Sequence, residues 1–560
     1  MLSKRRKNTK NVEFEQVLLD ATNVSMFDQN RLEGRLELPI ENKNLYYLAG
    51  VFLLTALILG YGIFSLQILE GSEHHYASEN ISTVQGMLIA ERGVIYDRNK
   101  NPLAWNEFDP NNDYSFPTRS YTDHIGVGQL LGYVSYPQKD SNDVYWRTEY
   151  LGRNGVEGIF NQTLAGENGK QIVEVDALGE VLGRYKTLEP KPGNQVVLSI
   201  DVALSQALYD LIATSSKQAN FRSGAAAIMD VHSGEIIAMT SFPSYDPQIM
   251  ADGSPSPTIE KWNQDERYPF LNKVVGGVYT PGSVVKPFLA YAALEEEVVT
   301  PDTEIVSTGE LVIPNPYNPD KPTIFRDWRA HGKMDLREGI AFSSNVYMYY
   351  ISGGYKEQEG VGIEKMNKYF NKFGFGRKTG INLDNEQIGV VPSPEWKQEN
   401  FSEDWLLGDT YNTAIGQFGW QTTPLQILRA YAALANGGFL VTPHIQKDSV
   451  SKRSNLNLDE ESLKVVQEGM RMAVNYDGGT ARSLERDDVE IAAKSGTAQV
   501  GVGNAFVNSW AAGYFPYQDP QYAFVLLMER APQDNTLGAT TIMGRAFDWM
   551  AENAPDYLNP

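Results

Sequence analysis

A serine and a lysine three residues apart stand at the start of an apolar stretch near the middle of the chain. Ser283 and Lys286 lie within residues 279–288, and the apolar residues that follow predict a buried helix. Positions i and i+3 of a helix share a face, so the Lys286 amine can reach the Ser283 hydroxyl. A hydroxyl becomes a nucleophile when a base lies beside it, and a lysine can be that base if its pKa is lowered. The pair therefore predicts nucleophilic catalysis by Ser283.

The spacing alone is a weak signal, because a chain of this length should contain about two such pairs by chance. A second pair, Ser449 and Lys452, lies in a polar run without an apolar face and is expected in an exposed loop. Only the first pair can hold its lysine in a water-poor site, where the lysine pKa falls.

Two polar residues later in the chain are candidate partners of this pair. Ser343 and Asn345 interrupt an otherwise apolar run. The Ser343 hydroxyl can relay a proton between Lys286 and a leaving amine, and the Asn345 amide can hold both Lys286 and a substrate carbonyl. A capped helix turn is the structural alternative for the same residues.

A lysine-hydroxyl-glycine motif occurs twice, and the neighbouring residues distinguish the copies. The copy at residues 378–380 follows a glycine-rich turn and is predicted to be a surface turn. The copy formed by Lys494, Ser495 and Gly496 lies within residues 489–500, which are typical of a strand. An edge strand can pair with an extended peptide substrate through its backbone. The second copy is therefore the predicted substrate-binding motif.

That strand also predicts how charge on the substrate would be stabilised. We expect an oxyanion hole formed by the backbone N–H groups of Ser283 and Thr497. Lys494, Ser495 and Thr497 are expected to bind a terminal carboxylate of the substrate. A Lys494 ammonium near Lys286 is also expected to lower the pKa of Lys286.

Composition excludes several other classes of function. The 560 residues carry a net charge of −22, which argues against nucleic-acid binding. The chain has no cysteine, which excludes thiol catalysis, disulfides and cysteine metal ligands. Its six histidines are scattered, and none forms a ligand pair. We predict neither a metal nor a cofactor.

One segment is predicted to be a membrane anchor. Residues 44–69 contain no charged side chain and would span about 39 Å as a helix, enough to cross a bilayer. Lysine and arginine are frequent before this segment and absent between residues 70 and 91. The positive-inside rule then places residues 1–43 in the cytoplasm as a tail and the rest of the chain outside the membrane.

The remaining chain divides by pattern into two domains. Residues 70–195 contain short β-like runs, for example 92–99, 130–134 and 170–175. A turn-rich stretch at 189–194 marks the predicted boundary. Residues 196–560 alternate strands and helices, with a hairpin at 232–234 and two antiparallel strands around 517–520.

With these residues in view, the chain resembles the class B penicillin-binding proteins, the monofunctional peptidoglycan D,D-transpeptidases. The three catalytic motifs, the anchor, and residues 91–99 and 152–158 carry the resemblance. Residues 325–328 and 408–417 are similar to the elongation-type penicillin-binding protein 2 rather than to the division-type enzyme. Only about 125 residues separate the anchor from the catalytic domain, which leaves no glycosyltransferase domain.

The resemblance implies an α+β fold: a single N-terminal transmembrane helix, a β-rich pedestal (dimerisation-type) domain at 70–195, and a β-lactamase-like transpeptidase domain at 196–560. That last domain should have a central antiparallel sheet covered by helices. It also implies a bacterial cytoplasmic-membrane protein whose catalytic domain is extracytoplasmic. Some members of the subgroup bind zinc near residues 326–328, but Asp327 and His331 are the only plausible ligands here, so zinc is not carried over.

The implied activity is cross-linking of D-Ala-D-Ala stem peptides through an acyl-enzyme on Ser283 during cell elongation, with β-lactams acylating the same serine. The implied partners are nascent peptidoglycan, a RodA-type polytopic glycosyltransferase and other elongation-complex proteins. A division-type transpeptidase is the first alternative. A β-lactamase is a weaker alternative because of the pedestal and the anchor. A membrane-anchored β-lactam sensor is also weaker, because the 43-residue tail is too small for a signalling domain.

Overall fold

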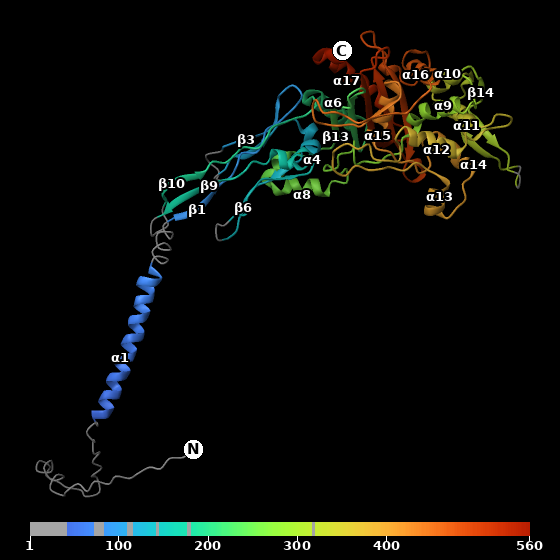
Figure 1. The fold of residues 1–560 in the computed structure, drawn as a ribbon. Coiled ribbons are helices and arrows are strands. Elements are labelled where there is room, and N and C mark those ends of the chain that lie inside the picture. The colour runs from blue at the N-terminus through green and yellow to red at the C-terminus, as the bar shows by residue number, and fades with distance from the viewer. Residues whose placement is uncertain are drawn as a thin grey trace, which may run out of the picture. The chain divides into compact units, whose positions relative to one another are not determined.

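A computed structural model describes residues 42–71, 83–108, 116–141, 145–175, 181–315, 318 and 320–560 (Figure 1). The chain forms two compact units, one of Met1–Val84 with Glu174–Gly183 and one of Gln85–Val173 with Arg184–Pro560. The predicted cytoplasmic tail, residues 1–43, lies outside the described residues except for its last two.

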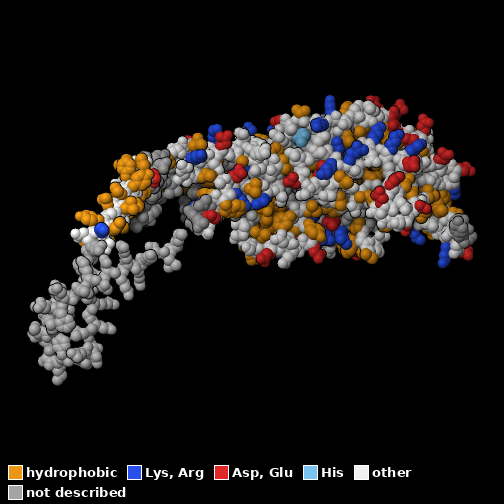
Figure 2. All heavy atoms as spheres, turned by 60° about the horizontal axis from the view of Figure 1, so that its bottom comes forward, with side chains coloured by type: hydrophobic (Ala, Val, Ile, Leu, Met, Phe, Trp, Pro, Cys, Tyr) orange, Lys and Arg blue, Asp and Glu red, His pale blue; other side chains and the backbone are white. Residues whose placement is uncertain are grey.

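The first unit contains the predicted membrane anchor. Helix α1, Asn42–Phe64, continues into a π-helical turn, η4, Ser65–Leu69. None of these side chains is buried, and Figure 2 shows apolar side chains along the visible face of the helix. Asn42–Leu69 is long and apolar enough to cross a membrane. The helix predicted at 44–69 is confirmed.

The described residues between 83 and 197 are rich in short strands. One four-stranded sheet has the order β11-β2-β3-β4, and a three-stranded sheet has the order β1-β9-β10. The first sheet comprises β2 Ile95–Tyr96, β3 Pro102–Glu107, β4 Thr118–Tyr121 and β11 Val196–Val197. The second comprises β1 Thr83–Leu88, β9 Gly169–Val175 and β10 Val181–Leu188. The β9 bounds confirm the strand predicted at 170–175.

Strand β11 pairs in parallel with β2, Val196 opposite Ile95. Backbone pairing of the N-terminal sheet thus continues past the turn at 189–194. The domain boundary at residue 195 stays a prediction.

The segment predicted as β-like at 130–134 is only partly a strand. Gly128–Leu131 forms the short helix α3, and the strand β5 begins afterwards at Tyr133–Ser135. Gly132 has a φ of 71°, which ends the helix, and its N–H donates to the Gly128 carbonyl. A short buried apolar run fits a helix or a strand equally well, so the sequence pattern did not separate them.

The other N-terminal elements are small pairs and single turns. They are η5 Ile125–Val127, β6 Gln138–Lys139 paired with β7 Tyr145–Arg147, β8 Leu151–Arg153 paired with β5, α4 Gly155–Ile159 and α5 Asn161–Leu164.

A five-stranded antiparallel sheet forms the centre of the C-terminal part, in the order β13-β12-β22-β21-β20. The strands are β12 Ser223–Asp230, β13 Ile236–Phe242, β20 Ala492–Val500, β21 Phe506–Phe515 and β22 Tyr522–Pro532. The hairpin predicted at 232–234 joins β12 to β13, and the predicted antiparallel pair around 517–520 is β21 with β22. Both predictions are confirmed, and β20 is an edge strand.

Helices cover both faces of this sheet because its strands alternate between two apolar cores. On β12, Ala225 and Ala227 face one core, and Ala226 and Ile228 face the other. Helices α9 Lys286–Glu295 and α15 Pro424–Ala435 contribute to the first core. Helices α6 Val202–Ala219 and α17 Ala539–Asn553 lie side by side on the second (Figure 1). The predicted helix-covered antiparallel sheet is confirmed.

The remaining elements surround these layers. They are α7 Pro247–Asp252, α8 Ser256–Gln264, η6 Gly282–Val285, β14 Ile305–Ser307, β15 Glu310–Ile313, β16 Thr323–Arg326, β17 Gly332–Met334, α10 Leu336–Ala341, α11 Asn345–Gly353, α12 Ile363–Lys372, α13 Pro394–Phe401, α14 Leu407–Ala414, β18 Phe439–Val441, β19 Arg453–Asn455, α16 Glu460–Asn475, η7 Arg482–Leu484, η8 Val502–Asn504 and η9 Pro555–Tyr557.

Candidate active site

Ser283 and Lys286 lie where a 3₁₀ turn becomes a long helix. Ser283 belongs to η6, and Lys286 is the first residue of α9. In a 3₁₀ turn the side chains at i and i+3 eclipse, so the two residues face the same side. Ser283 is partly exposed, Lys286 is fully buried, and the Ser283 hydroxyl has no hydrogen-bond partner among the described residues. The serine is therefore accessible while the lysine is held out of water.

The Lys286 amine is bound by the second predicted motif. Its Nζ donates to the Ser343 carbonyl oxygen at 2.7 Å, to the Ser343 hydroxyl at 3.3 Å and to Asn345 Oδ1 at 2.7 Å. Burial lowers the pKa of Lys286 to about 7, although the Asp327 carboxylate acts in the opposite direction. All three acceptors are uncharged, so burial is opposed only by the more distant Asp327.

The turn that carries Ser343 and Asn345 has an unusual backbone. Ser343 has a φ of 58°, a left-handed conformation that side chains other than glycine rarely adopt. Ser344 is the N-cap of α11, and its hydroxyl accepts from the Tyr347 N–H at 3.2 Å. Both predicted interpretations of this segment, a capped helix turn and a set of polar partners for Lys286, are therefore present in the same residues.

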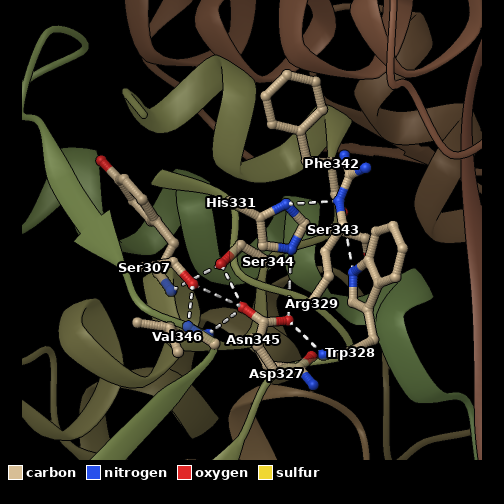
Figure 3. A network of polar contacts seen from close by, with 12 residues as sticks. Ser307, Asp327, Trp328, Arg329, His331, Phe342, Ser343, Ser344, Asn345 and Val346 are labelled. Carbon is tan, nitrogen blue, oxygen red and sulfur yellow. Dashed lines mark hydrogen bonds and ion pairs between the residues drawn. The ribbon is translucent and has the colours of Figure 1, made fainter. Parts of the chain in front are cut away.

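Asp327 holds this turn from the opposite side (Figure 3). One of its carboxylate oxygens accepts from the Ser344 hydroxyl at 2.7 Å and from the Val346 N–H at 3.0 Å. Burial alone would raise the pKa of Asp327, but hydrogen bonds from the backbone N–H groups of Asn345 and Val346 and the charge of Lys286 hold it below its usual value. Asp327 therefore stays ionised and fixes the residues on both sides of Asn345.

The residues next to Asp327 do not fit a metal ion. His331 Nε2 lies 3.6 Å from the other Asp327 oxygen, and His331 Nδ1 accepts from Arg329 Nε at 3.3 Å (Figure 3). The Arg329 guanidinium packs 4.5 Å from the centroid of the Trp328 ring. In the part of the chain that the structure describes, no group of three or more acidic, histidine or cysteine side chains could hold a metal. A guanidinium beside the histidine would also repel a cation.

Lys494 lies on β20 and is fully buried like Lys286. Its Nζ donates to the Ser495 carbonyl oxygen at 3.0 Å. Burial, and then the charge of Lys286, hold the pKa of Lys494 well below its usual value. The sequence predicted that Lys494 lowers the pKa of Lys286, and burial is the largest cause of the lowered pKa at both lysines.

The free edge of β20 presents backbone groups beside the nucleophile. Alternate residues of an edge strand direct their N–H and C=O groups to the open side, and β20 pairs on its other side with β21. The backbone N–H and carbonyl of Gln499 lie 3.1 and 3.3 Å from the Gln417 amide on that open side, so Ser495, four residues earlier, directs its carbonyl there as well. Thr497, two residues on, has the same orientation, and its side chain is exposed.

Two glycines bring the nucleophile turn against this strand. Gly282 has a φ of 59°, and a Cβ built on it would lie 2.8 Å from the Thr497 carbonyl oxygen. A Cβ on Gly496 would lie 2.9 Å from a methyl group of Val284. Any side chain at either position would separate Ser283 from Thr497. The structure thus brings together Ser283 and Lys286, Ser343 and Asn345, and Lys494 to Thr497.

The second copies of the motifs lie elsewhere. Lys378 is exposed and outside any strand, and the neighbouring Thr379 N–H donates to Glu386 at 2.6 Å. Ser449 is exposed in a segment without regular structure.

Three residues at the site were missed as functional candidates by sequence reasoning. The sequence indicates Asp327 only as a possible metal ligand. Thr480 Oγ1 accepts from the Ser495 hydroxyl at 2.8 Å, and Gly416 O accepts from the Gly282 N–H at 3.0 Å. None of the three belongs to a catalytic motif, so no local pattern pointed to them.

The fold and the site together define a serine-type acyltransferase. Two family models match the chain: the penicillin binding protein transpeptidase domain at residues 224–547 and the penicillin-binding protein dimerisation domain at 112–198. The chain belongs to the penicillin-binding proteins that carry a transpeptidase domain.

Named relatives and solved structures define the subgroup. The Haemophilus influenzae peptidoglycan D,D-transpeptidase MrdA is 30% identical over 75% of this chain and 68% of that protein. Helicobacter pylori PBP2, solved as a complex with MreC, is 27% identical with a TM-score of 0.69, covering 84% of this chain and 99% of that one. A chain from a peptidoglycan synthase complex that coordinates polymerization and crosslinking is 26% identical with a TM-score of 0.68, covering 90% and 97%. The predicted penicillin-binding transpeptidase of the penicillin-binding protein 2 type is confirmed.

Proposed function

We propose that this chain cross-links peptidoglycan through an acyl-enzyme on Ser283. The single observation that carries the assignment is the Lys286 amine, buried at the start of α9 and bound by Ser343 and Asn345. A lysine with a pKa of about 7 has a large neutral fraction at physiological pH, which a general base requires.

In the first step the donor stem peptide acylates the enzyme. Neutral Lys286 takes the proton of the Ser283 hydroxyl, and Ser283 Oγ attacks the carbonyl carbon between the last two D-alanine residues. The bond from that carbon to the terminal amine breaks. The amine leaves as free D-alanine after it takes a proton from Lys286 through the Ser343 hydroxyl, which lies 3.3 Å from Lys286 Nζ.

The edge of β20 stabilises the charge formed in that step. The N–H groups of Ser283 and Thr497 form the oxyanion hole, in which one donor is typically worth about 3–4 kcal/mol. Lys494, Ser495 and Thr497 bind the terminal carboxylate of the donor, and Gly496 lets the strand approach the nucleophile turn.

In the second step an amine of a neighbouring stem peptide attacks the acyl carbon. Lys286 takes the proton of the attacking amine, a new peptide bond forms, and Ser283 Oγ leaves and is protonated again. A β-lactam follows the first step and remains on Ser283.

We infer the cellular setting from the anchor and the relatives. Helix α1 crosses the cytoplasmic membrane once, with the N-terminus in the cytoplasm and the catalytic domain outside, as the distribution of basic residues supports. Partners are an MreC-like protein and a RodA-type glycosyltransferase, by analogy with the complexes that similar proteins form.

A fluorescent penicillin tests the nucleophile. The full-length protein in detergent should be labelled, Ser283→Ala should not be, and Ser449→Ala should be labelled like wild type because Ser449 lies in an exposed loop. An unlabelled wild type or a labelled Ser283→Ala would overturn the assignment.

Depletion of the protein in cells tests its role in growth. Cells that become round support a function in elongation. Filaments would instead assign the enzyme to division.

A further inference from the structure

One position on the open edge of β20 is occupied by a side chain of the chain itself. With the Gln417 amide oxygen toward the Gln499 N–H and its nitrogen toward the Gln499 carbonyl, the two distances are 3.1 and 3.3 Å. A glutamine amide carries one acceptor and one donor side by side, as a peptide backbone does. Gln417 therefore pairs with β20 in the way that an added strand would.

This position is the next one that a bound peptide would reach. Ser495, Thr497 and Gln499 direct their backbone groups to the open side of β20 because alternate residues share an orientation. A donor whose penultimate residue pairs with Thr497 places its carbonyl in the proposed oxyanion hole. Its backbone would then pair next with Gln499, two residues or about 6.8 Å further along the strand. Gln417 occupies that place.

The backbone of Gln417 is fixed on both sides. Before it, the Gly416 carbonyl accepts from the Gly282 N–H at 3.0 Å, which ties the segment to the nucleophile turn. After it, the Phe418 ring packs edge-on against Trp396 with ring centroids 5.9 Å apart. The amide is thus presented to β20 from an anchored segment rather than from a freely moving side chain.

We propose that Gln417 ends the peptide-binding edge of β20 at Thr497 and so determines how much of the donor peptide the enzyme recognises. This inference rests on the proposed transpeptidase function. The donor backbone pairs with Thr497, its terminal carboxylate lies near Ser495, and the residues upstream of the penultimate one leave the strand. Recognition through the backbone is confined to the C-terminal end of the donor.

Displacement of Gln417 by a longer donor brings no net advantage. Such a peptide would gain two hydrogen bonds to Gln499 and would break the two that Gln417 makes. Exchange of equivalent hydrogen bonds contributes little to affinity. A donor longer than the recognised end should therefore bind no more tightly through this edge.

The dependence of KM on donor length tests directly whether recognition ends at Thr497. Two synthetic donors ending in D-alanyl-D-alanine, an N-acetylated tripeptide and an N-acetylated pentapeptide of α-linked residues, are compared by release of D-alanine from the full-length enzyme. The two KM values of wild type should agree within about twofold. In Gln417→Ala the Gln499 backbone is open, and the KM of the pentapeptide should fall roughly three- to tenfold relative to the tripeptide.

Two further variants make the result decisive. Gln421→Ala removes an exposed glutamine from the same segment and should keep the wild-type ratio of KM values. Gln417→Glu can still accept from the Gln499 N–H but cannot donate to its carbonyl, so the ratio should shift in the same direction by less. If Gln417→Ala does not fold, the ratio of KM values in Gln417→Glu tests the proposal.

The outcomes separate this inference from the function on which it rests. Wild type that no penicillin labels refutes the proposed function. Labelled Gln417→Ala and Gln417→Glu with the wild-type ratio of KM values refute the inference alone. So does a wild-type enzyme that already binds the pentapeptide several-fold more tightly than the tripeptide.

Discussion

Two clusters of buried charge in the second unit are built in opposite ways. In the N-terminal part, the Arg92 and Arg119 guanidinium groups flank the Glu157 carboxylate at 2.6 and 2.8 Å, and all three side chains are fully buried. At the active site, Lys286 and Lys494 are equally buried, and their hydrogen-bond acceptors are neutral. One cluster pairs opposite charges and the other places like charges near each other.

The difference appears in the direction of the pKa shifts. Burial would raise the pKa of Glu157, but the two arginines reverse this and hold it below its usual value. Burial lowers the pKa of both lysines, and Asp327 only partly opposes it at Lys286. A paired buried charge keeps its ionisation state and stabilises the fold, whereas a buried lysine with neutral acceptors becomes able to exchange a proton.

Removal of the base should have the largest effect. Lys286→Met keeps a long side chain at the start of α9 but removes the amine, so acylation by penicillin should slow by roughly 10²- to 10⁴-fold. Circular dichroism should remain that of wild type. A variant acylated at the wild-type rate would show that Lys286 is not the base.

Removal of the paired carboxylate should affect stability instead. Glu157→Gln leaves two buried arginines without a counter-charge, which should cost about 3–5 kcal/mol of the free energy of unfolding in denaturant titrations. Glu167, whose carboxylate meets Lys191 at 2.7 Å in an exposed pair, provides the control, and Glu167→Gln should be almost neutral. If both variants lost the same free energy of unfolding, the buried ion pairs would contribute no more to stability than the exposed one.

The pH profile of acylation tests whether the buried Lys286 amine exchanges a proton near neutral pH. The neutral amine of Lys286 is the reactive form, and its fraction grows as pH rises through about 7. The acylation rate constant should therefore rise with pH below 7 and level off above it, as stopped-flow measurements with a fluorescent penicillin can show. A profile flat from pH 5 to 9 would be inconsistent with Lys286 as the base.

The smallest expected effect concerns Asp327. Asp327→Asn removes the negative charge that raises the pKa of Lys286, so the midpoint of the pH profile should move to lower pH. The maximal rate should fall by less than about tenfold, because an asparagine retains part of the hydrogen bonding to Ser344 and Val346. A midpoint that stays in place while the rate falls would assign Asp327 a purely structural role.

Much of the fold follows from local patterns. The uncharged run at 44–69 predicted its helix, and the two runs that flank the turn at 517–520 predicted β21 and β22. Residues 130–134 show the limit, since a short apolar run does not distinguish a helical turn from a strand. The Lys494 strand was predictable because an apolar run flanks it, and the same reasoning separated it from the copy at 378–380.

The site could be predicted to the level of its motifs. The sequence supplied Ser283, Lys286, Ser343, Asn345 and Lys494, since residue type and spacing define what chemistry each can do. It did not supply Asp327 as a support of the Ser343 turn or Gln417 as an occupant of the β20 edge. Their contacts join segments that are far apart in the chain, and no periodicity records such contacts.

The sequence by itself determined the reactive groups, the long apolar helix and several strands of the central sheet, because these depend on residue type and on neighbours along the chain. Tertiary structure decided which acceptors hold Lys286, that burial is the largest cause of its lowered pKa, and that Gln417 lies on the open edge of β20. Desolvation and strand pairing depend on what packs around a group, and that is set only when the sheet and its helices come together.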